Sequence, residues 1–177
     1  MLMGEKVILR PVHSDDVKKF FKWRNDLEIK TFSLMHPFPV TLESEEDWYE
    51  NISRSKDNGM VIFSIVENNN VVGFIKLFNI NWIHRFCYFG IVIGEKSAHG
   101  KGIGTEATKL IIDYAFNILN LKKIILEVVD FNEKAISLYK KIGFIEEGRL
   151  KQNVFLNGKW HDVLIMSLFT NKILENS

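Results

Sequence analysis

The feature that most constrains this fold is a glycine-rich segment between an apolar strand and an amphipathic helix. Residues 86–93 predict a strand, and Gly100, Gly102 and Gly104 follow before a helix expected to begin at Thr105. Glycines lack a Cβ and let backbone N–H groups approach an anion, while the positive end of a helix dipole adds to the attraction. The segment therefore predicts a phosphate-binding turn.

Two kinds of phosphate ligand compete for this turn. Residues 102–107 satisfy the G-x-G-x-x-A spacing of dinucleotide-binding folds, and Asp130 ends the next expected strand. In those folds the glycines follow the strand almost at once, whereas residues 94–101 intervene here, and roughly half of the chain precedes the motif. A Walker-type loop is excluded because no Gly-Lys-Ser/Thr sequence is present. The alternative ligand is the pyrophosphate of coenzyme A.

A second motif favours coenzyme A. The strand expected at residues 123–129 is followed by the sequence NEKAISLYKKIGF at residues 132–144. This N-x-x-A-x-x-x-Y-x-x-x-G-F pattern, placed a helix and a strand after the glycine-rich turn, resembles the GNAT superfamily of acetyl-CoA-dependent N-acetyltransferases. The resemblance covers nearly the whole chain, from Val7 to Phe169.

The resemblance implies acetyl-CoA as the cosubstrate and a set of residues that bind it. The family's Q/R-x-x-G-x-G/A loop matches residues 99–104, with His99 where glutamine or arginine is usual, so one cationic contact is lost. The family pattern also implies that residues 90–93 diverge from the next strand, that pantetheine lies in the gap, and that a backbone N–H faces the thioester oxygen. The implied cofactor-binding residues are Ile91, Val92, Ile93, His99, Gly100, Lys101, Gly102, Ile103, Gly104, Thr105, Asn132 and Lys134, and no metal is expected.

Tyr139 is the expected general acid, because it matches the family tyrosine that protonates the CoA sulfur. It lies on a helix that Asn132 is expected to cap. The general base stays unassigned. Tyr88 stands where many relatives have a glutamate, which leaves Glu127 and His84 as candidates, or an amine that arrives unprotonated or loses its proton through water.

The sequence does not identify the acceptor amine. The C-terminal half resembles bacterial spermidine N-acetyltransferases and RimJ/RimL-type ribosomal-protein N-terminal acetyltransferases, for example in FLNGKW at 155–160. An acidic, aromatic polyamine pocket could come from residues 43–49, which read equally well as a solvated helix start. Lys76 replaces an acid of the spermidine enzymes and would repel a polycation if it faced the pocket. The segment 27–40 and the hairpin at 151–160 are implied to frame a site for a small amine, an amino-sugar nucleotide or a protein N-terminus.

The function expected is therefore direct acetyl transfer from acetyl-CoA to a primary amine, of a polyamine or of a protein N-terminus. The alternative is a catalytically weak, CoA-binding regulatory module. A net charge of +1 gives no reason to expect a nucleic-acid or membrane partner, and a homo-oligomer is left open. The chain starts without an apolar export segment, and its lone Cys87, read as a small buried side chain, can form no internal disulfide. These features predict a cytoplasmic enzyme.

The expected fold is a single α/β domain over residues 1–177: a mixed, mostly antiparallel sheet that splays at the CoA site and carries helices on both faces. The helix at 105–119 has one apolar face, as a helix packed on a sheet requires. Asn-rich turns predict hairpins at 68–70 and 157–158. The other strands are expected at 7–10, 61–67, 71–78, 145–150, 153–156 and 160–169, with helices capped by Ser14 and Ser44 and an irregular segment at 27–40.

Overall fold

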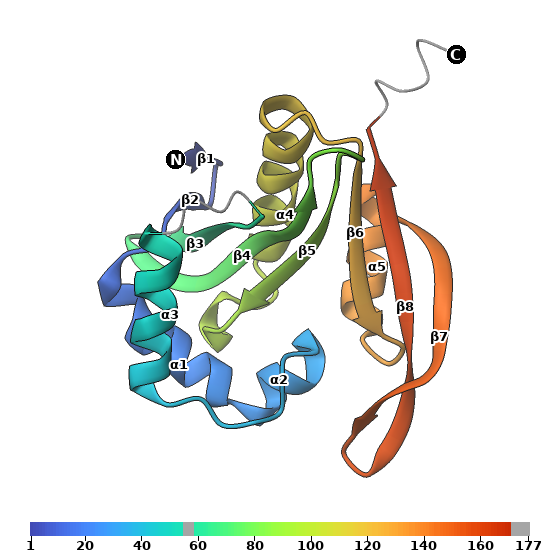
Figure 1. The fold of residues 1–177 in the computed structure, drawn as a ribbon, viewed down its shortest axis with the longest axis horizontal. Coiled ribbons are helices and arrows are strands. Elements are labelled where there is room, and N and C mark those ends of the chain that lie inside the picture. The colour runs from blue at the N-terminus through green and yellow to red at the C-terminus, as the bar shows by residue number, and fades with distance from the viewer. Residues whose placement is uncertain (55–58, 171–177) are drawn as a thin grey trace.

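The computed structural model describes residues 1–54 and 59–170, which form one eight-stranded sheet in the order β1-β2-β3-β4-β5-β6-β8-β7 (Figure 1). Neighbouring strands are antiparallel except for the parallel pair β5 and β6. The expected mixed, mostly antiparallel sheet is thus confirmed. The strands are β1 (Leu2–Met3), β2 (Ile8–Pro11), β3 (Val61–Glu67), β4 (Asn70–Asn81), β5 (Phe86–Ile93), β6 (Lys123–Val129), β7 (Ile145–Leu156) and β8 (Lys159–Phe169).

Helices cover both faces of this sheet (Figure 1). One face carries α1 (Val17–Asn25), α2 (Leu27–Ser33) and α3 (Leu42–Arg54), and the other carries α4 (Ile103–Asp113) and α5 (Glu133–Ile142). Two 3₁₀ turns lie at Ser14–Asp16 and Lys96–Ala98, and a π-helical turn at Tyr114–Ile118 follows α4. None of the helices in the described ranges is long and apolar enough to cross a membrane.

Each face of the sheet has its own apolar core. On the α4 and α5 side, residues such as Ile75, Ile111 and Leu126 pack together, each with at most 1% of its surface exposed. On the opposite side a smaller cluster joins Phe20 of α1 to Phe74 of β4, with ring centroids 5.0 Å apart. Because helices cover both faces of the sheet, its strands carry apolar side chains on both faces.

Several elements are found where the sequence predicts them. The bounds of β3, β5 and β6 agree with the expected strands, and both hairpin turns are present. Asn68 and Asn69 have φ of 47° and 64°, and Asn157 and Gly158 have φ of 50° and 79°. Positive φ at two successive positions is the requirement of a tight hairpin turn, which asparagine and glycine meet at low cost.

The segment at 27–40, expected to be irregular, begins with a helix instead. The Asp26 side chain accepts hydrogen bonds from the N–H groups of Glu28 and Ile29, and this cap starts α2. The next helix also starts earlier than expected, at Leu42, because Thr41 rather than Ser44 lies at its N-terminus. The Thr41 hydroxyl accepts from the Ser44 N–H at 3.1 Å.

Other differences concern the ends of elements. The helix expected at 105–119 begins at Ile103, because Gly102 serves as its N-cap with φ of 83°, and its last part is the π-helical turn. The short strand β1 was not predicted. The two strands expected at 145–150 and 153–156 are one strand, β7, whose register against β8 shifts twice.

Candidate active site

The parallel strands β5 and β6 separate after three residues. Their pairing covers Phe86 to Tyr88 on β5 and Lys123 to Ile125 on β6, and no later pair is formed between them. Strand β5 stays bonded to β4 as far as Ile93, and β6 stays bonded to β8 along its whole length. Each strand therefore follows its other neighbour, and the two diverge (Figure 1).

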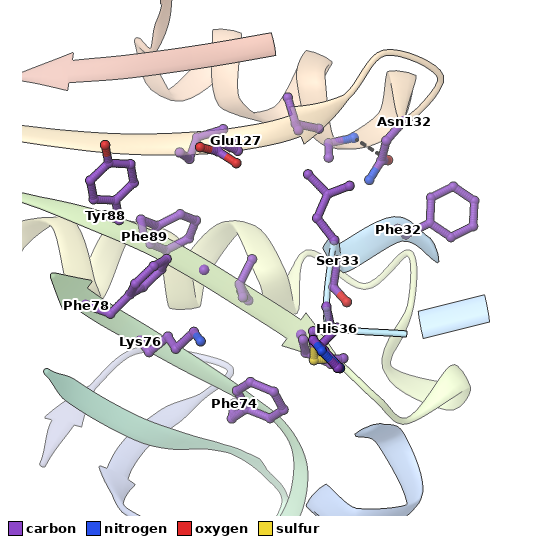
Figure 2. A pocket seen from close by; sticks show the side chains of 18 of the residues that line it. Phe32, Ser33, His36, Phe74, Lys76, Phe78, Tyr88, Phe89, Glu127 and Asn132 are labelled. Atoms are coloured by element: carbon purple, nitrogen blue, oxygen red, sulfur yellow. Dashed lines mark hydrogen bonds between the residues drawn. The ribbon is translucent and has the colours of Figure 1, made fainter. Parts of the chain in front are cut away.

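A cavity of about 690 Å³ occupies this divergence. Its lining comes from β4, β5, β6 and α5, from Arg24 of α1, and from the end of α2 with the residues after it (Figure 2). It therefore contacts side chains from both layers of helices, through the gap in the sheet. The residues that line it are Arg24, Phe32, Ser33, Leu34, Met35, His36, Val40, Phe74, Lys76, Phe78, Asn79, Tyr88, Phe89, Gly90, Ile91, Val92, Leu126, Glu127, Val128, Asn132, Ala135 and Tyr139.

Tyr139 reaches this cavity from α5. Its side chain is 8% exposed and packs edge-on against Phe89, with ring centroids 6.1 Å apart. Burial raises the pKa of the Tyr139 phenol to about 12, because the apolar surroundings disfavour the phenolate. Asn132 lies at the start of the same helix, where its side chain accepts a hydrogen bond from the Ala135 N–H at 3.3 Å. The expected helix cap is confirmed.

The glycine-rich turn connects β5 to α4. Gly100 and Gly102 have φ of 75° and 83°, a region that residues with a Cβ rarely adopt. Gly104 lies within the first turn of α4, where it needs no special backbone angle. The Nε2 atom of His99 lies 2.9 Å from the carbonyl oxygen of Ile93, so the imidazole ties the turn to the end of β5.

The N-terminal residues also hold this turn in place. Lys6 Nζ donates a hydrogen bond to the Lys101 carbonyl at 3.2 Å. The carboxylate of Glu106 accepts from the backbone N–H groups of Glu5 and Lys6. The side chain of Lys101 lies near Glu67, with Nζ 3.6 Å from Oε1. Contacts between the chain start and α4 thus help to fix the shape of the turn.

A shallow depression lies beside the first turns of α4 and α5. Its volume is about 570 Å³, and Thr105 and Lys134 both line it, together with Ser137 and Lys141. Of the residues expected to bind the cofactor, Ile91, Val92 and Asn132 line the main cavity instead. The expected set is therefore spread over the cavity, the turn and this depression.

The two candidates for the general base lie in different places. Glu127 lines the cavity from β6, whereas the exposed His84 lies in the turn between β4 and β5 and does not line it. Tyr88, which the resemblance puts at the position of a family glutamate, also lines the cavity. Cys87 is fully buried outside the cavity lining, and burial raises the pKa of its thiol to about 12. A buried thiol of this kind is a poor nucleophile.

The expected frame of the acceptor site is only partly found. Residues of α2 and the segment after it line the cavity, but none of the described residues of the 151–160 hairpin does. The acidic segment 43–49 does not line it either. Within that segment Glu45 is neither solvated nor in a pocket: it is fully buried and accepts a hydrogen bond from Arg24 at 3.0 Å.

Strand β4 contributes three side chains to the cavity, of which only Lys76 was considered for the pocket from the sequence. Phe74, Lys76 and Phe78 alternate along this strand and all face the cavity (Figure 2). The alternation was visible in the sequence, because every second residue of a strand faces the same side. The side that faces the cavity was not, since it depends on how α1 and α2 pack.

The comparisons with known proteins agree with this geometry. The spermidine N(1)-acetyltransferase of Vibrio cholerae is 33% identical to this chain over 175 residues, which is 99% of each protein. A crystal structure of the Vibrio cholerae spermidine N-acetyltransferase with CoA and spermine has a TM-score of 0.88 at 32% identity, and the match covers 97% of this chain and 99% of that one. A dodecameric structure of the Vibrio cholerae enzyme in an intermediate state has a TM-score of 0.82 at 32% identity, covering 98% and 99%.

The family is shown by the match of most of the chain to a family model. Residues 6–145 match the model described as an acetyltransferase (GNAT) domain. This span runs from β2 to the start of β7 and includes the glycine-rich turn, the diverging strands and Tyr139. The chain therefore belongs to the GNAT acetyltransferase family, and it is an N-acetyltransferase that uses acetyl-CoA.

Proposed function

We propose that the protein transfers the acetyl group of acetyl-CoA directly to the primary amine of a small acceptor, in the cavity between β5 and β6. The observation that carries this proposal is the early separation of the two strands, whose pairing ends at Tyr88 and Ile125. The separation leaves one edge of β5 without a strand partner beside a cavity that holds a buried tyrosine. Free backbone groups of this kind suit the amide groups of pantetheine.

The residues proposed to bind acetyl-CoA follow the path from this edge to the glycine-rich turn. The backbone of residues 91–93 would bind pantetheine, and residues 99–104 with the first turn of α4 would bind the pyrophosphate. Asn132, Thr105 and Lys134 complete the proposed set. The positive φ of Gly100 and Gly102 supports this assignment, because it exposes backbone N–H groups at a helix N-terminus.

Tyr139 is proposed as the general acid. When the amine attacks the thioester carbonyl, the C–N bond forms and the C–S bond breaks. The Tyr139 hydroxyl protonates the departing sulfur, the attacking nitrogen loses a proton to solvent, and solvent returns a proton to the Tyr139 oxygen. Its pKa of about 12 keeps the phenol protonated at neutral pH, but a thiolate whose thiol has an ordinary pKa of ~8.5 would not take this proton readily. The same apolar surroundings raise the pKa of the leaving thiol and reduce this difference.

Glu127 is proposed as the carboxylate that binds the acceptor amine and helps to remove its proton. Its carboxylate can hold the ammonium form of the amine and can pass the proton to water. It is the one carboxylate among the described residues that line the cavity, which supports this role.

Polyamines are the first acceptors to consider, because similar proteins are named as spermidine N-acetyltransferases. We further propose that residues 1–177 form a single acetyltransferase domain and that the enzyme is cytoplasmic. A homo-oligomer is also proposed, since a similar protein forms a dodecamer. The single sheet that includes strands from both ends of the described chain supports the single domain.

The test is the release of CoA thiol from acetyl-CoA with spermidine as the acceptor, with an amine-free reaction as control. Saturable, amine-dependent release is the expected result. If acetyl-CoA binds but no amine among polyamines, amino sugars, amino acids and peptide N-termini increases thiol release, the protein is instead a CoA-binding regulatory module.

A further inference from the structure

The charges that line the cavity are unusual for a site that takes a polycation. Among the described residues of the lining, Arg24 and Lys76 are cations and Glu127 is the only carboxylate. A polyamine has several ammonium groups and no anion, so it would gain from carboxylates and lose from lysine. Because Arg24 is paired with the buried Glu45, the lining charges without an ion pair among the described residues are one cation, Lys76, and one carboxylate, Glu127.

Lys76 lies on the floor of the cavity without a counter-ion. It pairs with Gly90 across β4 and β5, and a Cβ added at Gly90 would lie 3.4 Å from Lys76 Cε, so the lysine stem passes over this glycine. Its ammonium lies 4.6 Å from the centre of the Phe78 ring. No ion pair of Lys76 is found within residues 1–54 and 59–170.

The surroundings disfavour the charge of Lys76. Burial lowers the pKa of its ammonium, and the positive charge of Arg24 lowers it further. An anion bound beside the ammonium would raise the pKa of Lys76 again, because opposite charges at close range stabilise each other strongly in a partly buried site.

Arg24 differs from Lys76 because it already has a carboxylate partner. Its guanidinium donates to Glu45 Oε2 at 3.0 Å and lies 5.0 Å from the centre of the Trp48 ring. The partner Glu45 is fully buried, so the pair is fixed within the protein. Glu45 thus holds Arg24 in place, although the charge of Arg24 still lowers the pKa of Lys76. Lys76 is the cation of the lining that has no ion pair among the described residues.

Glu127 lies on the opposite side of the cavity from Lys76. Figure 2 shows the carboxylate on β6 above the cavity and the ammonium on β4 below it. No ion pair of Glu127 is found within the described chain. An opposed carboxylate and ammonium, neither of them in an ion pair among the described residues, match a ligand that carries both an amine and an acid.

We propose that the acceptor is an amine that also carries an anionic group, a carboxylate or a phosphate, and that Lys76 binds this group while Glu127 faces the amine. The inference rests on the proposed acetyl transfer, and it favours acidic amines over the polyamines considered first above. Two sources share this chemistry: amino acids supply a carboxylate, and phosphorylated amino sugars supply a phosphate.

The experiment compares pairs of acceptors that differ only in the acid. Glucosamine 6-phosphate is paired with glucosamine, and L-alanine with L-alaninamide, while spermidine represents the polycations. Thiol release from acetyl-CoA gives kcat/KM for each acceptor. We expect at least a tenfold preference for the acidic member of one pair, which also tells phosphate from carboxylate, and a lower value for spermidine.

Variants of Lys76 test whether this residue causes the preference. Lys76→Gln removes the charge and should lower kcat/KM at least tenfold for the acidic acceptor, with little change for its uncharged partner. Lys76→Glu should lower it further and should raise turnover of spermidine. The control is Lys109→Gln, since Lys109 is exposed on α4 and does not line the cavity.

The outcomes separate this inference from the proposed function. Equal losses on all acceptors in Lys76→Gln would mean that the lysine acts in the reaction itself, and they would overturn the inference. A wild-type preference for spermidine or for uncharged amines would also overturn it, while leaving acetyl transfer intact.

A binding measurement decides the inference without turnover. Titration calorimetry in the presence of CoA would compare glucosamine 6-phosphate with glucosamine, and alanine with alaninamide. Tighter binding of an acidic member that is lost in Lys76→Gln supports the inference even if no acceptor is acetylated. Equal binding within both pairs contradicts it.

Discussion

The buried carboxylate of Asp16 connects β2, the 3₁₀ turn that follows it and β3. Arg10 donates two hydrogen bonds to it, at 2.7 and 2.8 Å, Ser64 donates one at 2.6 Å, and the backbone N–H of His13 donates one at 2.9 Å. Burial alone would raise the pKa of Asp16, but these hydrogen bonds outweigh it and hold the pKa below its ordinary value.

Asp16→Asn should destabilise the protein in a pH-dependent way. A folded-state pKa below the unfolded value gives stability that is fully present above the unfolded pKa and is lost as pH falls through the folded pKa. At pH 7 the variant should lose about 2–4 kcal/mol, because Arg10 loses its buried counter-ion. The difference from the wild type should shrink towards pH 3.

Urea unfolding between pH 3 and pH 7 measures this effect. The neighbouring Asp15→Asn is the matched control, because Asp15 is exposed and should change stability by less than about 0.5 kcal/mol. A loss in Asp16→Asn that is equal at all pH values would contradict the account.

The start of α4 depends on the backbone conformation of the glycine-rich turn. Gly102 is the N-cap of α4 in the left-handed region, and Lys6 Nζ lies 3.4 Å from where its Cβ would be. Gly102→Ala forces an alanine into this conformation at a cost of about 1–2 kcal/mol. Since that cost is avoided only by reshaping the turn, we expect acetyl-CoA to bind at least fivefold more weakly.

Titration calorimetry with acetyl-CoA measures this change. Gly148→Ala is the control, because Gly148 lacks a positive φ and an added Cβ there would meet no atom within 4 Å. Equal affinities in wild type and Gly102→Ala would show that the turn does not hold the pyrophosphate.

The bounds of helices and strands were predictable where local sequence determines them, and less predictable where tertiary packing determines them. The strands at 86–93 and 123–129 were found from their apolar runs, and the turns from asparagine and glycine. The start of α2 was missed because residues 27–40 carry aromatic residues and prolines, and the cap from Asp26 was not recognised. The bounds of α4 depended on Gly102 acting as a cap instead of a loop residue.

The site as a whole could be predicted only in part. The motif correctly predicted that Asn132 caps a helix and that a glycine turn precedes α4, because both depend on local sequence, and Tyr139 lines the cavity. The face to which Lys76 points and the pairing of Arg24 with Glu45 could not be predicted, since both depend on tertiary packing. The ion pair joins α1 to α3, between residues 21 positions apart.

In the whole molecule, the gap between β5 and β6 connects the two helical layers that cover the sheet. The helices α2 and α5 lie on opposite faces of the sheet (Figure 1), and the cavity is lined both by residues after α2 and by Tyr139 of α5. In the proposed reaction an acceptor and acetyl-CoA would approach from different sides and meet between β5 and β6. Direct transfer at Tyr139 is therefore the central claim of the account.

The most direct test measures kcat for thiol release in the wild type and in Tyr139→Phe, with the fastest acceptor found, alongside acetyl-CoA affinity by calorimetry. The control is Tyr114→Phe, because Tyr114 does not line the cavity. The account predicts that kcat falls about 10²–10⁴-fold in Tyr139→Phe only, with the acetyl-CoA Kd within twofold of wild type. A kcat within threefold of the wild type would contradict it.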